Sequence, residues 1–350
     1  MATPVVSPAA PQAQAAAVTP DRVLALGNGY WISQMMAAAC RYRFFTLIAS
    51  GTNTADAIAE AAATDARGTR VVLDGLAAVQ LLTKRDGRYG LAPDAEQYLV
   101  EGRPGSLAPL LAGHIPLTWD AWGRLGDLLA NGRPTTSHGS YEDDAEGTAF
   151  FARLIRPIMP LSLGPADATA EHLGVGTRRK GLRILDVGAG SGAWSIPFAR
   201  RDAACEVTAF DLPRILEETR TIVAEYGVAD RYRMTAGDLR TADFGRGVYD
   251  VAILGNICHG LTPEANRDLF ERLRAALKPG GELIIGDMLP NDDRTAPPFP
   301  VLFAVNMYVN GAEDTYPLSQ YRKWLRDAGY AGVAAFDTHR SHSPVIIATK

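Results

Sequence analysis

The chain has few of the features that mark secreted or membrane proteins. Only three cysteines occur in 350 residues, Cys40, Cys205 and Cys258, and their odd number and wide spacing give neither a disulfide framework nor metal-ligand spacing. We therefore expect a reducing, cytoplasmic location. No apolar run approaches the ~20 residues needed to span a bilayer. The first twenty residues contain no Lys or Arg, which excludes a signal or transit peptide, and we expect residues 1–20 to form a disordered tail.

The chain also lacks an excess of positive charge. Its 39 acidic and 35 basic residues give a formal net charge of −4, which supplies no general attraction to nucleic acid or to an anionic membrane. A hydrophobic content of 47% and a charged content of 21% are typical of a soluble globular protein. The length exceeds that of one ordinary domain, so we expect two domains and small-molecule partners.

The N-terminal third has the pattern of a winged helix. Apolar residues recur with mostly helical spacing over 21–48, and so much apolar surface predicts a partner chain or tight docking. A capped helix begins at Thr54, a second helix covers 69–82 with Val79 among its inward residues, and 84–91 reads as a hairpin. Residues 54–100 carry five basic and seven acidic side chains, which argues against DNA binding.

Residues 105–173 look helical, with a polar, glycine-containing interruption over 131–147. Each aromatic or methionine residue in this segment, taken alone, is best interpreted as part of a hydrophobic core. The position of the segment between two domains, however, favours a ligand pocket. With residues from 299–307, the predicted pocket comprises Trp119, Trp122, Phe151, Met159, Phe299, Phe303, Asn306 and Met307. Its mainly apolar lining predicts a planar, poorly charged substrate.

From residue 181 onward, strand and helix patterns alternate, which is typical of an α/β fold with a doubly wound parallel sheet. The predicted strands are 182–187, 206–210, 231–235, 249–254 and 282–286, and the predicted helices lie near 192–201, 213–226 and 263–277. The last two runs, 333–336 and 345–348, are close enough in sequence to form an antiparallel pair at one edge.

A glycine-rich turn follows the first of these strands. Gly188, Gly190 and Gly192 permit positive φ and a close approach of backbone to ligand, and the next helix offers unpaired N–H groups. Gly188, Gly190 and Ala193 also satisfy the dinucleotide fingerprint. Asp186, however, would repel a pyrophosphate and would suit a sulfonium, so the pattern favours S-adenosylmethionine over NAD.

Two further acids follow the next strands. Asp211 stands where a carboxylate accepts hydrogen bonds from ribose, and Asp238 stands where an adenine amino group could be held. Each acid alone could instead be a helix cap or part of a solvated turn, but three acids at successive strand ends favour a cofactor site. Leu212 and Asn256, which follow the second and fourth predicted strands, are also predicted cofactor residues.

The fourth strand leads into a candidate general base, His259. Methyl transfer from a sulfonium mainly requires alignment of the acceptor and removal of its proton, for which a histidine is suited. Asp287 and Glu313 are the acids that could hold its ring. The alternative is that His259 caps a backbone carbonyl. We interpret Cys258 as core, because neighbours on an extended segment point opposite ways.

The remaining histidines, His114, His138, His339 and His342, have no metal-like partners in the sequence, and we interpret them as incidental.

Over roughly residues 20–350 the sequence resembles the two-domain, S-adenosylmethionine-dependent O-methyltransferases of the plant caffeic-acid type and their bacterial natural-product relatives. The resemblance rests on the winged N-terminal domain, the turn from Asp186 to Gly192, the acids Asp211 and Asp238, and Ile257-Cys258-His259. It implies a Rossmann-like class I methyltransferase domain over 176–350, a winged-helix dimerisation domain over 21–104 and a helical connector over 105–175.

By this resemblance His259 would be the general base, flanked by Asp287 and Glu313, and Gly188, Asp211, Asp238 and Leu239 would contact the cofactor. The family is homodimeric through its N-terminal domain and uses no metal. S-adenosylhomocysteine would be the product of the cofactor, and the acceptor would be a hydroxyl of an aromatic or polyketide-like molecule.

The residues around His259 depart from the plant pattern. Plant members have Asp-Trp after the histidine and Lys-Trp before Ile-Cys-His, whereas this chain has Gly260-Leu261 and Gly255-Asn256. Relatives on this fold methylate carbon or nitrogen, or use the cofactor without methyl transfer, as in pericyclic reactions. Those activities are the alternative to O-methylation.

Overall fold

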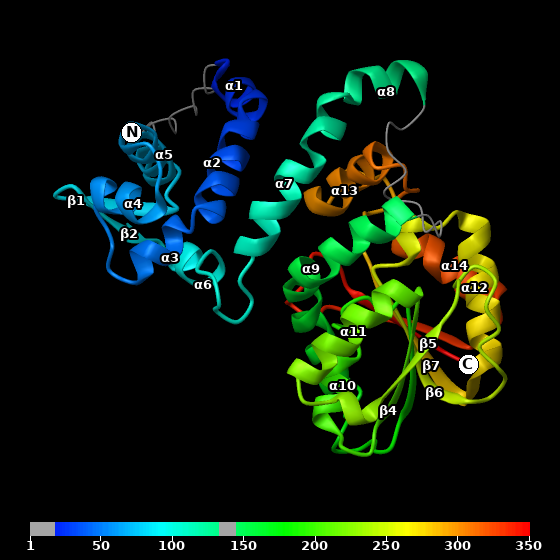
Figure 1. The fold of residues 1–350 in the computed structure, drawn as a ribbon. Helices are drawn as coiled ribbons and strands as arrows, with labels where there is room; N and C mark the ends of the chain where they lie inside the picture. The colour runs from blue at the N-terminus through cyan, green and yellow to red at the C-terminus, as the bar shows by residue number, and fades with distance from the viewer. Residues whose placement is uncertain (1–17, 133–144) are drawn as a thin grey trace, which may run out of the picture.

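The computed structural model describes residues 18–132 and 145–350. Figure 1 shows a helical N-terminal part and an α/β C-terminal part, with long helices between them. Most of the tail expected over 1–20, and most of the polar interruption expected over 131–147, lie outside the described residues.

The N-terminal part contains six helices and a hairpin among the described residues. The helices are α1 (Asp21–Gly27), α2 (Gly29–Arg41), α3 (Phe44–Ala49), α4 (Ala55–Ala62), α5 (Ala66–Ala78) and α6 (Pro93–Tyr98), and the hairpin pairs β1 (Leu82–Arg85) with β2 (Arg88–Leu91). Asp86 and Gly87 between the strands both have positive φ, as a type I′ turn requires. The hairpin predicted over 84–91 is thus present.

The second helix of this part differs from its prediction over 69–82. It begins at Ala66, because the carboxylate of Asp65 accepts a hydrogen bond from the N–H of Gly68 at 2.6 Å. It ends at Ala78, and Gln80 has a positive φ that a helix does not continue through. Val79, predicted to point inward, is exposed.

Two connecting helices, α7 (Ala108–Gly123) and α9 (Ala145–His172), lead to the C-terminal part, with the short α8 (Leu125–Asn131) after α7. Helix α7 packs along α2 and also contacts α9. Helix α9 packs on the C-terminal helices α10 (Ile196–Arg201) and α11 (Pro213–Glu225). The connecting helices therefore place side chains between the two parts of the chain.

The C-terminal part is built on a seven-stranded sheet with the order β5-β4-β3-β6-β7-β9-β8. Its strands are β3 (Arg183–Val187), β4 (Glu206–Asp211), β5 (Tyr232–Ala236), β6 (Tyr249–Gly255), β7 (Leu277–Gly286), β8 (Gly332–Phe336) and β9 (Val345–Thr349). The first five in the order are parallel, and β9 runs antiparallel to both β7 and β8. The doubly wound sheet and its antiparallel edge pair are confirmed.

Helices cover both faces of this sheet, as Figure 1 shows. The side chains of β6 alternate between two cores: Val251 and Ile253 join the core under α9 and α10, whereas Ala252 and Leu254 join the core under α12 (Pro263–Ala276) and α14 (Leu318–Asp327). The remaining helix is α13 (Pro298–Val309), and two short 3₁₀ helices are η1 (Ala229–Arg231) and η2 (Cys258–Gly260).

The chain order reverses between β3 and β6, because β4 and β5 extend the sheet on one side and β7 on the other. In open α/β sheets, ligands bind beyond the carboxyl ends of the strands at such a switch point. We therefore expect the ligand site at the turns that follow β3, β4, β6 and β7.

Candidate active site

A cavity of about 1890 Å³ lies at this switch point. Its walls come from the turns after β3, β4, β6 and β7, from α7, α9 and α13, and from the β8–β9 loop. Most of its lining is apolar; polar groups lie at the strand ends, on α9 and α10, and in the β8–β9 loop. This is the usual composition of a small-molecule site.

The glycine turn after β3 brings backbone to the cavity wall. Gly188 and Gly190 line the cavity and have φ of 66° and 52°. A Cβ at Gly188 would lie 2.2 Å from Cδ1 of Ile257, and side chains rarely adopt this positive φ, so glycine is favoured there. Gly192 is also left-handed but does not line the cavity; its N–H donates to the carbonyl of Ala189 and closes the turn.

Asp186 lies behind this turn rather than at the cavity. Its carboxylate is buried and accepts a hydrogen bond from the hydroxyl of Ser195 at 2.5 Å, and Ser195 is hydrogen-bonded in turn to the hydroxyl of Tyr232. Burial raises the pKa of Asp186 to about 7, and the negative charge of Asp211 adds to this effect. Asp186 therefore holds the turn in place. Its carboxylate does not line the cavity in which a sulfonium would bind.

Asp211, by contrast, lines the cavity at the end of β4, with Leu212 next to it. Its carboxylate accepts hydrogen bonds from the N–H of Gly190 at 2.8 Å and from the N–H of Leu212 at 2.7 Å. Burial raises its pKa to about 6, and the two backbone donors act against that rise. The carboxylate therefore joins the glycine turn to the strand end.

The predicted residues after β5 and β6 also line the cavity: Asp238, Leu239 and Asn256. Asp238 forms an ion pair with Arg240 at 2.7 Å, and hydrogen bonding to this guanidinium lowers the pKa of Asp238. Asn256 has a φ of 59°, donates its backbone N–H to the carbonyl of Gly286, and donates its side-chain N–H to the hydroxyl oxygen of Ser162 on α9 at 3.0 Å.

His259 and Asp287 form a largely buried polar pair on the cavity wall. Nδ1 of His259 lies 2.6 Å from Oδ1 of Asp287, and the backbone N–H of His259 donates to Oδ2 at 3.1 Å. Asp287 also accepts hydrogen bonds from the N–H of Met288 and the hydroxyl of Tyr321. A carboxylate that accepts from Nδ1–H leaves the lone pair of the ring on Nε2.

Glu313, the second predicted acid, is exposed and does not line the cavity. The contact of this segment with His259 is through backbone, since the N–H of Asp314 donates to the carbonyl of His259 at 3.2 Å. Of the two acids, the structure therefore brings only Asp287 to the imidazole.

Cys258 is fully buried and outside the cavity lining, as the core interpretation requires. The stated reason was wrong, however, because the residue lies in the 3₁₀ helix η2 and not in an extended segment. Burial raises the pKa of its thiol well above the ordinary value, and the charge of Asp287 adds to this. A thiol held in that state is a poor nucleophile.

Seven of the eight predicted pocket residues line the cavity: Trp122, Phe151, Met159, Phe299, Phe303, Asn306 and Met307. Phe303 packs edge-on to the ring of His259, with centroids 5.1 Å apart. Nε1 of Trp122 donates to Oδ1 of Asn306 at 3.1 Å, which joins α7 to α13. Trp119 is 41% exposed, lies outside the lining and packs near Tyr30 of α2.

Three histidines interpreted as incidental line the cavity: His114, His339 and His342. Nδ1 of His114 is buried without a hydrogen-bond partner among the described residues, and burial lowers its pKa. His342 stacks on Phe299 with centroids 4.2 Å apart. No sequence pattern marked these residues: His114 comes from α7, and His339 and His342 come from the loop between β8 and β9. His138 lies outside the described residues.

In the described residues, no group of three or more His, Cys, Asp or Glu side chains could hold a metal ion. The same part of the chain contains no helix that is long and apolar enough to cross a membrane.

Known proteins resemble this chain over most of its length. It is 28% identical to the 3-hydroxy-5-methyl-1-naphthoate 3-O-methyltransferase of Streptomyces sahachiroi, over 90% of each chain. It is 27% identical to the tetracenomycin polyketide synthesis 8-O-methyl transferase of Streptomyces glaucescens, over 90% of this chain and 92% of the relative. The solved structure of human N-acetylserotonin methyltransferase in complex with S-adenosylmethionine has the same fold, with a TM-score of 0.81, 23% identity, and coverage of 97% of this chain and 99% of that one.

Two family models match the two parts of the chain. One describes an O-methyltransferase dimerisation domain and matches residues 24–101; the other describes an O-methyltransferase domain and matches residues 178–331. The second match includes the glycine turn, Asp211, Asp238 and the pair His259 and Asp287. The chain belongs to the O-methyltransferase family that joins these two domains.

Proposed function

We propose that this enzyme transfers a methyl group from S-adenosylmethionine to a hydroxyl of an aromatic or polyketide-like molecule, with His259 as the general base. The single observation that carries the proposal is the pair His259 and Asp287 on the wall of a mainly apolar cavity, beside the glycine turn. The printed activities of the two Streptomyces relatives, on a naphthoate and on a polyketide, support this class of acceptor.

The residues of the glycine turn fit S-adenosylmethionine. Gly188 has no side chain, so backbone forms the cavity wall there, and Asp211 presents a carboxylate that can accept hydrogen bonds from ribose hydroxyls. Asp238 offers a further acceptor after β5. The bound cofactor supplies an electrophilic methyl group on a sulfonium, which needs little help as a leaving group.

His259 would remove the proton from the acceptor hydroxyl. Asp287 holds the proton on Nδ1, so Nε2 carries the lone pair and can accept a hydrogen bond from a hydroxyl in the cavity. When Nε2 takes the proton, the buried negative charge of Asp287 stabilises the imidazolium. Phe303 packs against the ring and restricts its rotation.

The acceptor would lie between α7, α9 and α13. Phe299, Phe303, Met159 and Met307 offer apolar and aromatic surface, which favours a flat, poorly charged molecule. The amide of Asn306 is turned toward Trp122. Efficient use of sugars or polyanions would contradict this description of the acceptor.

The test is a panel of hydroxylated naphthoates and related polyketide phenols, incubated with S-adenosylmethionine and analysed by mass spectrometry and NMR. We expect a product that gains one CH₂ unit, located on oxygen. A gain on carbon or nitrogen, or conversion of a substrate without a gain in mass, would instead support the alternative activities on this scaffold.

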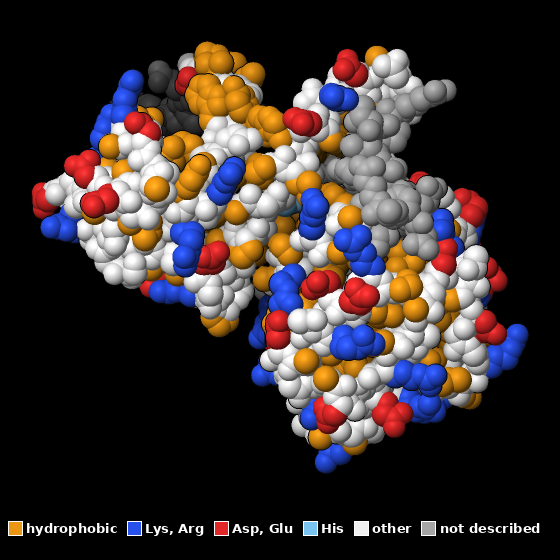
Figure 2. Space-filling model, viewed as in Figure 1, with side chains coloured by type: hydrophobic (Ala, Val, Ile, Leu, Met, Phe, Trp, Pro, Cys, Tyr) orange, Lys and Arg blue, Asp and Glu red, His pale blue; other side chains and the backbone are white. Residues whose placement is uncertain are grey.

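We also propose that the enzyme is a homodimer through its N-terminal part and works in the cytoplasm. The matched dimerisation domain supports the first statement, as do the large apolar side chains exposed on α1 and α2. Figure 2 shows hydrophobic side chains gathered over α1. The three cysteines, all free and buried, support a reducing location.

A further inference from the structure

The indole of Trp194 lies across the carboxyl ends of two central strands. A Cβ placed on Gly255, at the end of β6, would lie 2.0 Å from Cδ1 of the indole, and a Cβ on Gly286, at the end of β7, would lie 2.0 Å from Cη2. Both strands therefore end in glycine where the ring needs the space. Trp194 is only 7% exposed, so the ring is held in a defined position on the cavity wall.

The indole nitrogen in this position has no hydrogen-bond partner among the described residues, although it is buried. An indole N–H is a donor only, and buried donors in native proteins are nearly always paired. Gly255 offers no side chain that could pair with it. Because Trp194 lines the cavity, a molecule bound there can supply the missing acceptor.

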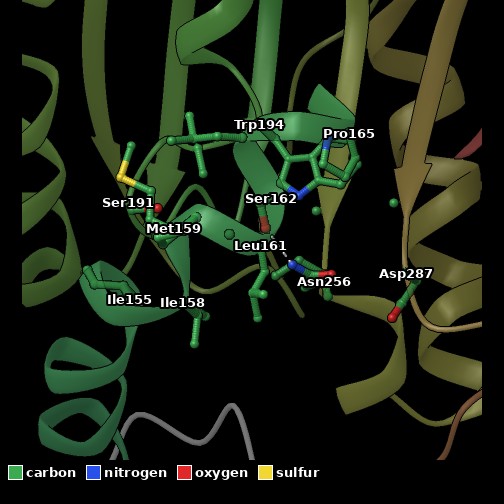
Figure 3. A pocket seen from close by; sticks show the side chains of 18 of the residues that line it. Ile155, Ile158, Met159, Leu161, Ser162, Pro165, Ser191, Trp194, Asn256 and Asp287 are labelled. Carbon is green, nitrogen blue, oxygen red and sulfur yellow. Dashed lines mark hydrogen bonds between the residues drawn. The ribbon is translucent and has the colours of Figure 1, made fainter. Parts of the chain in front are cut away.

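A second donor faces the same part of the cavity. Ser162 of α9 is buried, and its hydroxyl oxygen accepts a hydrogen bond from the side-chain N–H of Asn256 at 3.0 Å. Its own hydroxyl hydrogen is thereby directed away from Asn256. Figure 3 shows Trp194, Ser162 and Asn256 around one region of the cavity, with the indole nitrogen on the side of the ring that faces the other two.

Apolar side chains of α9, among them Met159 and Leu161, lie beside this polar region. Its donors are neutral, and they converge from the glycine turn and from α9. A carboxylate can accept hydrogen bonds from two N–H or O–H donors at once. Hydrogen bonds to an ionised acceptor are stronger than those between two neutral groups.

The acids of the site determine which end of the cofactor can lie here. Asp211 and Asp238 stand after β4 and β5, where they suit hydroxyl and amino donors and repel a carboxylate. Trp194 and Ser162 stand near the end of β6, on the other side of the glycine turn. A molecule with its ribose at Asp211 would present its amino-acid end at Trp194.

We propose that the indole N–H of Trp194 and the hydroxyl of Ser162 bind the α-carboxylate of S-adenosylmethionine and of S-adenosylhomocysteine. This assignment rests on the proposed function and adds the two residues that orient the amino-acid end of the cofactor. Because the ring of Trp194 is held in one position, it also determines where the amino-acid end of the cofactor lies.

The test compares two ligands by isothermal titration calorimetry: S-adenosylhomocysteine, and 5′-methylthioadenosine, which lacks the amino-acid group. Trp194→Phe should weaken S-adenosylhomocysteine binding by about tenfold or more and 5′-methylthioadenosine binding by less than about twofold, because only the first ligand offers the carboxylate. Ser162→Ala should show the same selectivity with a smaller loss, and it changes the packing little.

Trp122→Phe is the matched control, because its indole nitrogen is already paired with Asn306. It should leave both affinities unchanged. Equal losses for the two ligands in Trp194→Phe and Ser162→Ala, no loss in either variant, or the same selective loss in Trp122→Phe would overturn the assignment. Wild-type protein that fails to bind S-adenosylhomocysteine would instead overturn the proposed function.

Discussion

Nδ1 of His259 lies 2.6 Å from Oδ1 of Asp287, and the same carboxylate is hydrogen-bonded to two backbone N–H groups and to the hydroxyl of Tyr321. Four donors therefore fix the carboxylate, and the carboxylate fixes the imidazole. The side chain of Glu313 is exposed and takes no part in this arrangement.

Asp287→Asn tests that relationship. The amide is no longer an anion that accepts from Nδ1–H and stabilises the imidazolium, so we expect kcat to fall by about tenfold or more, part of the ~10²–10⁴ that a general base contributes. The affinity for S-adenosylmethionine should change little. Glu313→Gln, the matched change at the exposed acid, should leave kcat within about twofold. A larger loss for Glu313→Gln than for Asp287→Asn would reverse the assignment.

Asp186 should make the ligand-free protein less stable as pH rises. Its pKa is raised from 3.8 to about 7 by burial, so between these values the folded state keeps a proton that the unfolded state has released. Stability from this group is full below pH ~4 and is lost as pH rises through ~7. Asp186→Asn cannot ionise, and its stability relative to wild type should increase from pH ~5 to ~7 and level off above that in urea unfolding.

Asp250→Asn is the control for this experiment. Asp250 forms an ion pair with Lys278 at 2.8 Å, and hydrogen bonding to Lys278 lowers its pKa. Both folded and unfolded forms of this carboxyl group are ionised above pH ~5, so the variant should differ from wild type by a constant amount over the same range. Parallel curves for wild type and Asp186→Asn would show that the buried carboxyl group does not titrate as described.

Asp211 should make cofactor binding depend on pH. Its pKa is raised to about 6 by burial, and a ribose hydroxyl that donates to it favours the ionised form. The affinity for S-adenosylhomocysteine should therefore increase as pH rises through ~6 and then level off. Asp211→Asn should bind more weakly at pH ~7.5 and lose this part of the pH dependence. An unchanged profile in the variant would exclude Asp211 as the titrating group.

Much of the fold could be predicted from the sequence because its signals are local. Alternation of apolar strands and amphipathic helices indicated the doubly wound sheet, and the rule that ligands lie beyond strand ends pointed to Gly188, Asp211 and His259. The first helix after the glycine turn was predicted four residues too early, since the turn extends to Ser195 before α10 begins.

The orientation of single side chains could not be predicted in the same way. Asp186 and Asp211 both follow apolar runs, but Val187 continues β3 beyond Asp186, whereas Asp211 is the last residue of β4. Neighbouring residues of a strand face opposite sides of the sheet. A difference of one residue in where the strand ends therefore determines whether an acid lines the cavity. Trp119 and Trp122 differ similarly, because residues three apart on a helix point about 60° apart.

Residues from distant segments were the hardest to predict. His342 reaches the cavity from the β8–β9 loop and stacks on Phe299 of α13, and His114 reaches it from α7. Neither has a motif around it. Trp194 is different: it stands two residues after Gly192, and its place in the glycine turn was the signal that could have marked it as a cavity residue.

The exposed apolar face of the N-terminal part should be a subunit contact. Leu26 and Trp31 are 69% and 55% exposed in the single chain, which is unusual for residues of this size. The double variant Leu26→Glu/Trp31→Glu should be monomeric by light scattering, whereas we expect wild type to be dimeric. Val71→Glu, at another exposed apolar residue of the same part, should stay dimeric. A dimeric double variant would place the subunit contact elsewhere.

The central claim is that His259 is the base for methyl transfer to a hydroxyl, and single-turnover methylation at saturating S-adenosylmethionine tests it most directly. The comparison is between wild type and His259→Ala, with cofactor affinity measured on the same samples. We expect the rate of O-methyl product formation to fall by about 10²-fold or more while the affinity for S-adenosylmethionine stays nearly unchanged. An unchanged rate in His259→Ala, with the cofactor bound, would contradict the account.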